Sequence, residues 1–348
     1  MNILLLTSHS IAEYDDLRML TDLGYDVFSI GAYTDPQHPT DDKRPALAHV
    51  RSFPELADRC VDQREKHADE DARQVIDWAK GDLHEVIIGW ADVIIVHHFP
   101  ETWIGGQWDR IRRKRVIWRT CGQSDPRLES AMEPFHRDGM EIVRYSPRER
   151  NLPDYAGEDA LIRFGKYPDD YGPWRGDNLA IGNVTQDMAR RGNACGLGFW
   201  LEATHGLPTM PAGPGSEALG GLGQLDYYEM LDYLAGLRVY LYTGTTPASY
   251  TLGLMEAMLS GTPVVSISAS AFGNPELFEG DEIVGWSGDV ADGYPRSMRQ
   301  VAENTHQMLA DTLRFEEKAR NHSLEMRTRA LELFDVAVVG PQWKAFLG

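Results

Sequence analysis

The sequence is poor in cysteine: its 348 residues include only Cys60, Cys121 and Cys195, and none forms a Cys-x-x-Cys pair. A disulfide framework or zinc site is therefore not expected, and the usage fits a reducing cytoplasm. Long apolar runs are also missing, because residues 3–6 and 93–96 fall far short of the roughly 18 that cross a bilayer. The first residues lack a signal peptide's basic start and cleavage site, so they indicate a strand. We expect a cytoplasmic protein without a bound metal or organic cofactor.

Positive charge is scarce as well. The chain has 34 Lys and Arg against 53 Asp and Glu, a formal net charge of −19, which disfavours non-specific wrapping by nucleic acid. The local exception, here called the basic run, is residues 110–115, which contain Arg110, Arg112, Arg113, Lys114 and Arg115. The basic run is either a docking surface for an anionic partner, such as nucleic acid or membrane-surface lipid, or a solvated helix end that complements the helix dipole.

The first 145 residues alternate short apolar runs with helical patterns. Strands are predicted over residues 2–7, 27–30, 92–97, 116–119 and 141–145, and a long helix over residues 54–79. Strands that are separated by helices pair in parallel. The pattern therefore predicts an α/β, doubly wound, Rossmann-like domain over residues 1–165, with its ligand crevice at the carboxyl ends of the strands.

A second α/β pattern follows a turn-rich linker predicted over residues 166–177. Its predicted strands cover residues 179–182, 208–212, 239–242 and 264–267, and its helices cover residues 187–204, 226–234 and 251–259. We predict a second Rossmann-like domain over residues 178–333. A C-terminal helix is predicted over residues 334–348, with an interruption at Gly340-Pro341. One option for this helix is that it crosses back to the first domain. Two such lobes predict a cleft that binds a two-part ligand.

The most informative segment joins a predicted strand to a helix through a loop rich in Gly, Thr and Ser. The helix is predicted to begin near Thr251, Leu252 and Gly253, where free backbone N–H groups and the positive end of the helix dipole suit a diphosphate. Gly253 lets another atom come close to the backbone. Residues 252–265 read Leu-Gly-Leu-Met-Glu-Ala-Met-Leu-Ser-Gly-Thr-Pro-Val-Val.

This segment resembles the signature of retaining GT-B glycosyltransferases of the family 4 type. The order of the lobes and the terminal Gln342-Trp343-Lys344 are similar too, so the resemblance covers essentially the whole chain. It implies transfer of a sugar from a nucleotide diphosphate sugar to an acceptor hydroxyl, with retention of configuration and without a metal. It also implies that Glu256 binds the ribose hydroxyls of the donor.

The resemblance implies further donor contacts and also shows departures from the family. Arg191, with Arg190 as the alternative, is expected at the donor diphosphate, while Asn183 stands where the family usually has a first Arg. The loop that contains Gly244, Thr245 and Ser249 is expected to surround the donor sugar. A second family Glu, eight residues before Glu256, is replaced by Ala248.

In the first lobe, the resemblance implies a histidine that reaches the sugar. His98 is the expected residue, with His97 as its rival because the register is undecided. The remaining residues expected on the acceptor side follow the first and a later predicted strand: Ser8, His9, Arg119 and Gln123.

Two other functions stay open. A sugar-nucleotide epimerase could use the same fold, and would convert its substrate without an acceptor. A binding protein with a decayed site would hold nucleotide without turnover, as the loss of Glu at Ala248 suggests. The donor base, the donor sugar, the oligomeric state and the acceptor are not fixed by the sequence; a modified DNA base, a lipid or a glycan is compatible with it.

Overall fold

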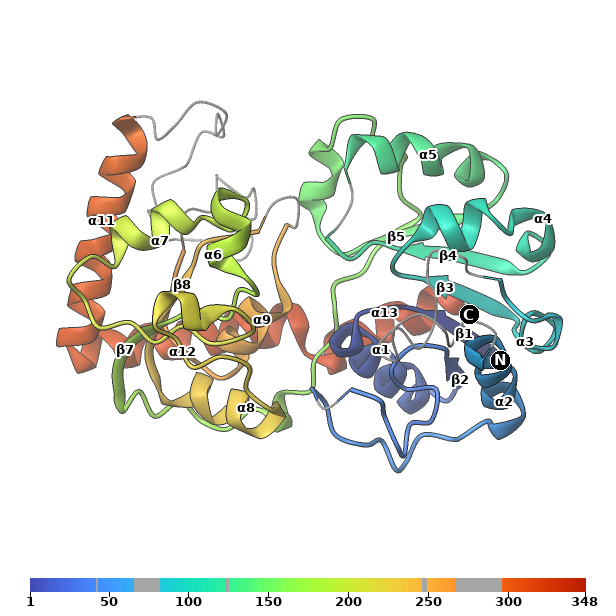
Figure 1. Ribbon diagram of the computed structural model, residues 1–348, viewed down its shortest axis with the longest axis horizontal. Helices are drawn as coiled ribbons and strands as arrows, with labels where there is room; N and C mark the ends of the chain where they lie inside the picture. Colours follow the sequence, from blue (N-terminus) through green and yellow to red (C-terminus); the bar gives the residue numbers. More distant parts are fainter. Residues whose placement is uncertain (42, 66–81, 123–124, 246–248, 267–295) are drawn as a thin grey trace. The chain divides into compact units, whose positions relative to one another are not determined.

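The computed structural model describes residues 1–41, 43–65, 82–122, 125–245, 249–266 and 296–348, with the backbone alone for 61–65 and 296–301. The chain forms two compact units (Figure 1). Unit 1 contains Met1–Lys166 and Val336–Gly348, and unit 2 contains Tyr167–Asp335. Within the described ranges, no helix combines the length and the apolar character that crossing a membrane requires.

Unit 1 is built on a parallel sheet in the order β2-β1-β3-β4-β5-β6. The order reverses between β1 and β3, which makes their carboxyl ends the switch point where open α/β sheets bind ligands. The five strands predicted from apolar runs are confirmed, and a short sixth strand was not predicted. The strands are β1 (Asn2–Leu6), β2 (Asp26–Ser29), β3 (Val93–Val96), β4 (Arg115–Arg119), β5 (Glu141–Arg144) and β6 (Ala160–Leu161).

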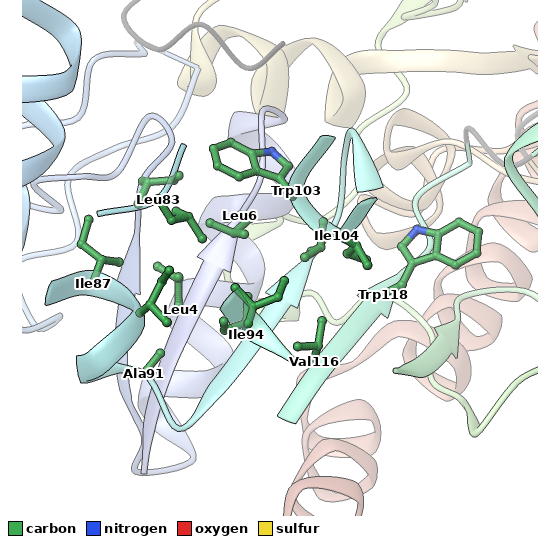
Figure 2. Close-up of a cluster of buried hydrophobic side chains, with 14 of the residues drawn as sticks. Leu4, Leu6, Leu83, Ile87, Ala91, Ile94, Trp103, Ile104, Val116 and Trp118 are labelled. Carbon is green, nitrogen blue, oxygen red and sulfur yellow. The ribbon is translucent and has the colours of Figure 1, made fainter. Parts of the chain in front are cut away.

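The inner strands β1 and β3 of unit 1 are almost wholly apolar because both faces of a doubly wound sheet are covered. Figure 2 shows Leu4, Ile94 and Val116 from adjacent strands in one buried cluster with Trp103 and Trp118. The helices are α1 (Ser10–Asp22), α2 (Pro54–Glu65), α3 (Glu85–Trp90), η1 (Glu101–Gly105), α4 (Trp108–Ile111), α5 (Pro126–Arg137), η2 (Pro147–Asn151) and α13 (Val336–Leu347). The predicted helix over residues 54–79 is described only as far as Glu65, the end of α2.

The C-terminal helix α13 packs on unit 1. Its Trp343 is fully buried, and Arg115 of β4 donates to the carbonyl oxygens of Phe346 (2.7 Å) and Leu347 (2.9 Å). The expected interruption at residues 340–341 is wrong, because the helix continues through Pro341. Residues on both sides of the proline, Val339 and Trp343, are buried, so packing stabilises the helix despite the missing N–H group.

A buried ion pair connects α5 to β5. The guanidinium of Arg144 donates to both carboxylate oxygens of Glu129, at 2.6 and 2.7 Å, and neither side chain is exposed. Glu129 also accepts from the backbone N–H of Ala156 at 2.9 Å. The pair therefore fixes α5 and the loop before β6 against the edge of the sheet.

Unit 2 contains a second parallel sheet, with β8 between β7 and β9. Its strands are β7 (Asn178–Gly182), β8 (Leu237–Tyr242) and β9 (Val264–Ser266). The predicted strand over residues 208–212 appears as a single parallel bridge, Ile181 to Thr209, on the other side of β7. The switch point of unit 2 therefore lies at the carboxyl ends of β7 and β8.

The predicted helix over residues 187–204 is in fact three short pieces. Gly192 (φ +58°) and Gly196 (φ +69°) adopt backbone conformations that end helical turns, which explains the breaks. The helices of unit 2 are η3 (Pro168–Asp170), α6 (Met188–Arg191), η4 (Gly192–Cys195), α7 (Leu197–Ala203), η5 (Ser216–Leu219), α8 (Tyr227–Gly236), α9 (Leu252–Leu259), α11 (Arg296–Arg314) and α12 (Glu316–Phe334).

Glu129→Ala should destabilise the protein by about 3–5 kcal/mol, because it leaves the Arg144 guanidinium buried without its carboxylate. Glu133→Ala is the matched control, since Glu133 lies on the same helix and pairs with Arg137 at the surface. The control should change the unfolding free energy by less than about 0.5 kcal/mol. Urea denaturation measures both, and equal effects would contradict the assignment.

Candidate active site

Two histidines meet at the switch point of unit 1. His9 follows β1 and His98 follows β3, and their rings stack with centroids 5.8 Å apart and planes 15° apart. β1 and β3 are hydrogen-bonded neighbours, so the fold brings together residues about 90 positions apart in the sequence. Ser8 lies beside them and is exposed.

His9 is the N-cap of helix α1. Its Nδ1 atom accepts from the backbone N–H of Ala12 at 3.4 Å, and its own backbone N–H donates to Thr7 Oγ1 at 3.2 Å. The residue as a whole is exposed, although protein surrounds its ring. Desolvation by the surrounding protein, together with the positive charges of Lys166, Lys43 and Arg44, lowers the pKa of His9 to about 4.

His98 lies beneath His9 and is only 3% exposed. Its Nε2 atom is 3.2 Å from the thiol sulfur of Cys121, and that sulfur is also 3.2 Å from the carbonyl oxygen of His97. Burial, followed by the neighbouring His9 and His97, holds the pKa of His98 well below its ordinary value. Cys121 was not among the expected site residues, although it lies in the same segment after β4 as Arg119 and Gln123.

His97 has different surroundings from His98. It is 1% exposed, and its Nε2 atom lies 3.2 Å from Oδ2 of Asp16 on α1. His98, and not His97, therefore joins His9 at the strand ends. The same helix buries two further acids: Asp15 pairs with Lys166 at 2.6 Å, and Glu13 accepts from the backbone N–H groups of residues 32 and 33.

Arg119 has a structural position that the sequence did not suggest. Its side chain is fully buried and donates to the carbonyl oxygen of Ile162. The guanidinium lies 4.5 Å from the ring centre of Phe164 and 5.4 Å from that of Trp343 on α13. The expected acceptor-side role is therefore corrected, because the side chain packs α13 against the sheet. The other expected residue of this segment, Gln123, lies outside the described residues.

The basic run is largely neutralised by neighbouring groups of unit 1. Arg110 pairs with Asp82 and Glu85, and Lys114 donates to the carbonyl oxygen of Ala91. Arg112 lies near Asp109 and Asp138, and Arg115 pairs with Glu141. Of the two alternatives for the basic run, these ion pairs favour the helix end over a docking surface for an anionic partner. Most of these side chains hold helices and strands together instead.

In unit 2, helix α9 begins directly after the loop that follows β8. Thr251 is its N-cap and accepts from the backbone N–H of Leu254 at 3.3 Å; Leu252, the first helical residue, is half-buried. A Cβ atom at Gly253 would come within 2.3 Å of Val184 Cγ2. Gly253 therefore allows the loop after β7 to pack against the first turn of α9, a role that accompanies the predicted ligand contact.

Glu256 lies one turn into α9 and is 5% exposed. Its charge acts on the hydroxyl of Tyr240 in β8, and that hydroxyl accepts from the backbone N–H of Val184 at 3.4 Å. Burial, with Glu256 contributing, raises the pKa of Tyr240 well above its ordinary value. The carboxylate is therefore near the carboxyl ends of both strands at the switch point of unit 2.

The two predicted arginines differ in their surroundings. Arg190 is 77% exposed and pairs with Asp187 at 2.8 Å. Arg191 is half-buried, with Nη1 3.4 Å from the carbonyl oxygen of Gln186. Burial raises the pKa of Cys195, whereas the charge of Arg191 and a hydrogen bond from Thr245 lower it. Arg191 and Thr245 therefore flank the same buried thiol, whereas Arg190 faces solvent.

The remaining predicted donor residues lie in the loop after β8. Gly244 has φ +78°, a conformation that favours glycine, and Ser249 is buried. Ala248 lies outside the described residues. Asn183, at the position where the resemblance led us to expect an Arg, supports the loop after β7: its amide donates to the Leu241 carbonyl at 2.8 Å and accepts from the N–H of residue 185 at 2.6 Å.

The chain matches no family model and no curated protein. Solved structures are similar over its whole length. The Anabaena protein Alr3699/HepE in complex with UDP-glucose has a TM-score of 0.62 at 16% identity, covering 100% of this chain and 99% of that one. A glycosyltransferase from Rickettsia africae has a TM-score of 0.61 at 10% identity, with 99% and 97% covered. An alpha-glucosyltransferase in complex with UDP-glucose and DNA containing an abasic site has 0.60 at 11%, with 100% and 99% covered.

The chain has a GT-B fold. The predicted fold class, α/β with two Rossmann-like units, is thus confirmed. Among the described residues, no group of three or more His, Cys, Asp or Glu is arranged to hold a metal ion.

The buried, neutral His98 should make the protein sensitive to acid. Its pKa is lower in the folded than in the unfolded chain. Below pH 6.5 the histidine is therefore protonated in the unfolded chain but not in the folded one, so the free energy of unfolding decreases as the pH is lowered. His98→Gln removes this titration. The unfolding free energy of the wild type relative to this variant should therefore decrease by up to about 1.4 kcal/mol per pH unit below 6.5. Urea denaturation at pH 7, 6 and 5 tests this, and parallel curves would contradict it.

Proposed function

We propose that the protein is a glycosyltransferase that moves a sugar from a nucleotide diphosphate sugar to an acceptor hydroxyl, with retention of configuration. The observation that carries the proposal is the buried carboxylate of Glu256, one turn into the helix that begins at the carboxyl edge of the unit 2 sheet. The similarity of the whole chain to structures that contain UDP or UDP-glucose supports it. The Leu252–Val265 signature supports the retaining class.

In this proposal, the donor nucleotide binds at the ends of β7 and β8. The first-turn N–H groups of α9 at Leu252 and Gly253 bind the diphosphate oxygens, because a helix N-terminus combines donors without intrahelical partners with a positive dipole. Glu256 accepts two hydrogen bonds from the ribose hydroxyls. The loop with Gly244 and Thr245 contacts the sugar.

The chemistry follows from positive groups near the diphosphate. The bond between the sugar carbon and the diphosphate oxygen breaks, a bond to the acceptor oxygen forms, and the acceptor proton leaves on the diphosphate. Arg191 and the N-terminus of α9 stabilise the negative charge that develops on the leaving group, which is a large catalytic term in such reactions. The protein itself supplies this positive charge, so the scheme is metal-independent.

The acceptor binds to unit 1, at the ends of β1 and β3. His9, His98 and Ser8 present polar groups there, and the neutral histidines favour recognition by hydrogen bonds. Because neighbouring groups neutralise most of the basic run, we propose that long-range charge contributes little to acceptor binding. A nucleic-acid hydroxyl is still a candidate acceptor.

Glu256→Ala should weaken the binding of UDP by at least about 10- to 150-fold, because even one of its two hydrogen bonds, made to a charged group, contributes about 1.5–3 kcal/mol. Glu202→Ala is the control, because Glu202 is an exposed carboxylate on α7 of the same unit. Isothermal titration calorimetry should show wild-type affinity for the control. Unchanged affinity in Glu256→Ala would reject the donor site.

Arg191→Ala should lower kcat by about 30- to 1,000-fold, because it removes about 2–4 kcal/mol of transition-state stabilisation, and should affect UDP affinity much less. Arg190→Ala, at the exposed neighbouring position, should retain most of the activity. Steady-state release of UDP from a sugar nucleotide measures both variants. A larger loss of kcat in Arg190→Ala than in Arg191→Ala would assign the diphosphate contact to Arg190 instead of Arg191.

A further inference from the structure

At the switch point of unit 1, the histidine that can meet a ligand is His9. His98 is 3% exposed and its Nε2 atom contacts Cys121, whereas His9, whose ring stacks on that of His98, is an exposed residue. His98 Nδ1 has no hydrogen-bond partner among the described residues. His98 therefore supplies a buried platform for His9, with its own ring fixed by the Cys121 thiol.

The protonation of the two His9 ring nitrogens follows from its contacts. Nδ1 accepts a hydrogen bond from the N–H of Ala12, so it carries no proton. A neutral ring must then carry its proton on Nε2. The backbone donor at Ala12 cannot reverse its role, so the helix cap fixes this tautomer.

The charged groups around His9 also oppose a second proton. The positive end of the α1 dipole lies at Nδ1, and Lys43, Arg44 and Lys166 add positive charge. Lys166 is partly compensated by its pair with Asp15. The stacked ring of His98 is itself neutral. His9 is thus a neutral donor over the physiological pH range.

We propose that His9 is a substrate-contacting donor of fixed tautomer, whose Nε2–H binds an oxygen of the transferred sugar or of the acceptor. This inference rests on the proposed function. It also gives His9 a limited chemistry. Because Nε2 holds the proton and Nδ1 is occupied by the helix cap, His9 cannot accept the acceptor proton, which agrees with a mechanism in which the diphosphate receives it.

Two substitutions distinguish the role of Nδ1 at the helix cap from the role of Nε2–H as a hydrogen-bond donor to the ligand. In His9→Asn, the amide oxygen can replace Nδ1 at the helix cap, but nothing replaces Nε2–H. In His9→Gln, the amide nitrogen can replace Nε2–H, but the cap is lost. With UDP-glucose as the probe, kcat/KM for UDP release should fall about 10- to 100-fold in His9→Asn, with a wild-type Tm. His9→Gln should have a lower Tm and retain more activity than His9→Asn.

Nitrogen NMR of the His9 ring gives a readout that does not depend on turnover. At pH 6 the spectrum should show a proton on Nε2 and a bare Nδ1, and UDP-glucose should shift the Nε2–H signal more than UDP does. A doubly protonated ring, a proton on Nδ1, or full activity in His9→Asn would overturn the role of His9.

Failure of the proposed function would look different. In that case the wild type would not bind UDP, would bind it without turning over any sugar nucleotide, or would lose no affinity for it in Glu256→Ala. The helix cap and the tautomer of His9 would still be visible by NMR. An active wild type with an equally active His9→Asn would reject the role of His9 alone.

Discussion

The parallel order of buried strands is the constraint on which both candidate sites depend. In unit 1, β1 lies between β2 and β3, and in unit 2, β7 lies between β8 and the bridge at Thr209. Each reversal leaves a pair of strand ends that no crossover helix covers. At the switch point of unit 1, β1 and β3 are almost wholly apolar, and the polar residues His9 and His98 follow these strands. Fold and chemistry are therefore set by the same topology.

The proposed binding groups lie where helices begin, directly after these strand ends. His9 caps α1, whose acids Glu13, Asp15 and Asp16 are buried against different parts of unit 1. Thr251 caps α9, whose Glu256 is also buried. In each unit, a cap side chain fixes the helix start, and packing below the first turn fixes its direction. The proposed ligand contacts depend on these caps. The variants His9→Asn and His9→Gln therefore separate the loss of a helix cap from the loss of a ligand contact.

Local patterns predict the strands of this protein well, because five apolar runs in unit 1 and three in unit 2 became strands. Local patterns do not predict features that depend on the backbone conformation of single glycines or on partners far away in the sequence. The helix predicted over residues 187–204 is broken by the positive φ of Gly192 and Gly196. Arg115 of the basic run pairs with Glu141, and Arg119 packs under α13, so neither charge could be assigned to a binding surface from its position in the chain. Likewise, the contact between His98 and Cys121 joins two strand ends and has no local signature.

Proton NMR of the reaction can show directly whether the protein transfers a sugar from a nucleotide sugar. The protein would be incubated with a panel of sugar nucleotides, including UDP-glucose, and the anomeric signals followed before the free sugar mutarotates. A retaining glycosyltransferase should release the nucleoside diphosphate and form a first product with the anomeric configuration of the donor. Conversion of a sugar nucleotide to its epimer without release, or binding without any turnover across the panel, would contradict it.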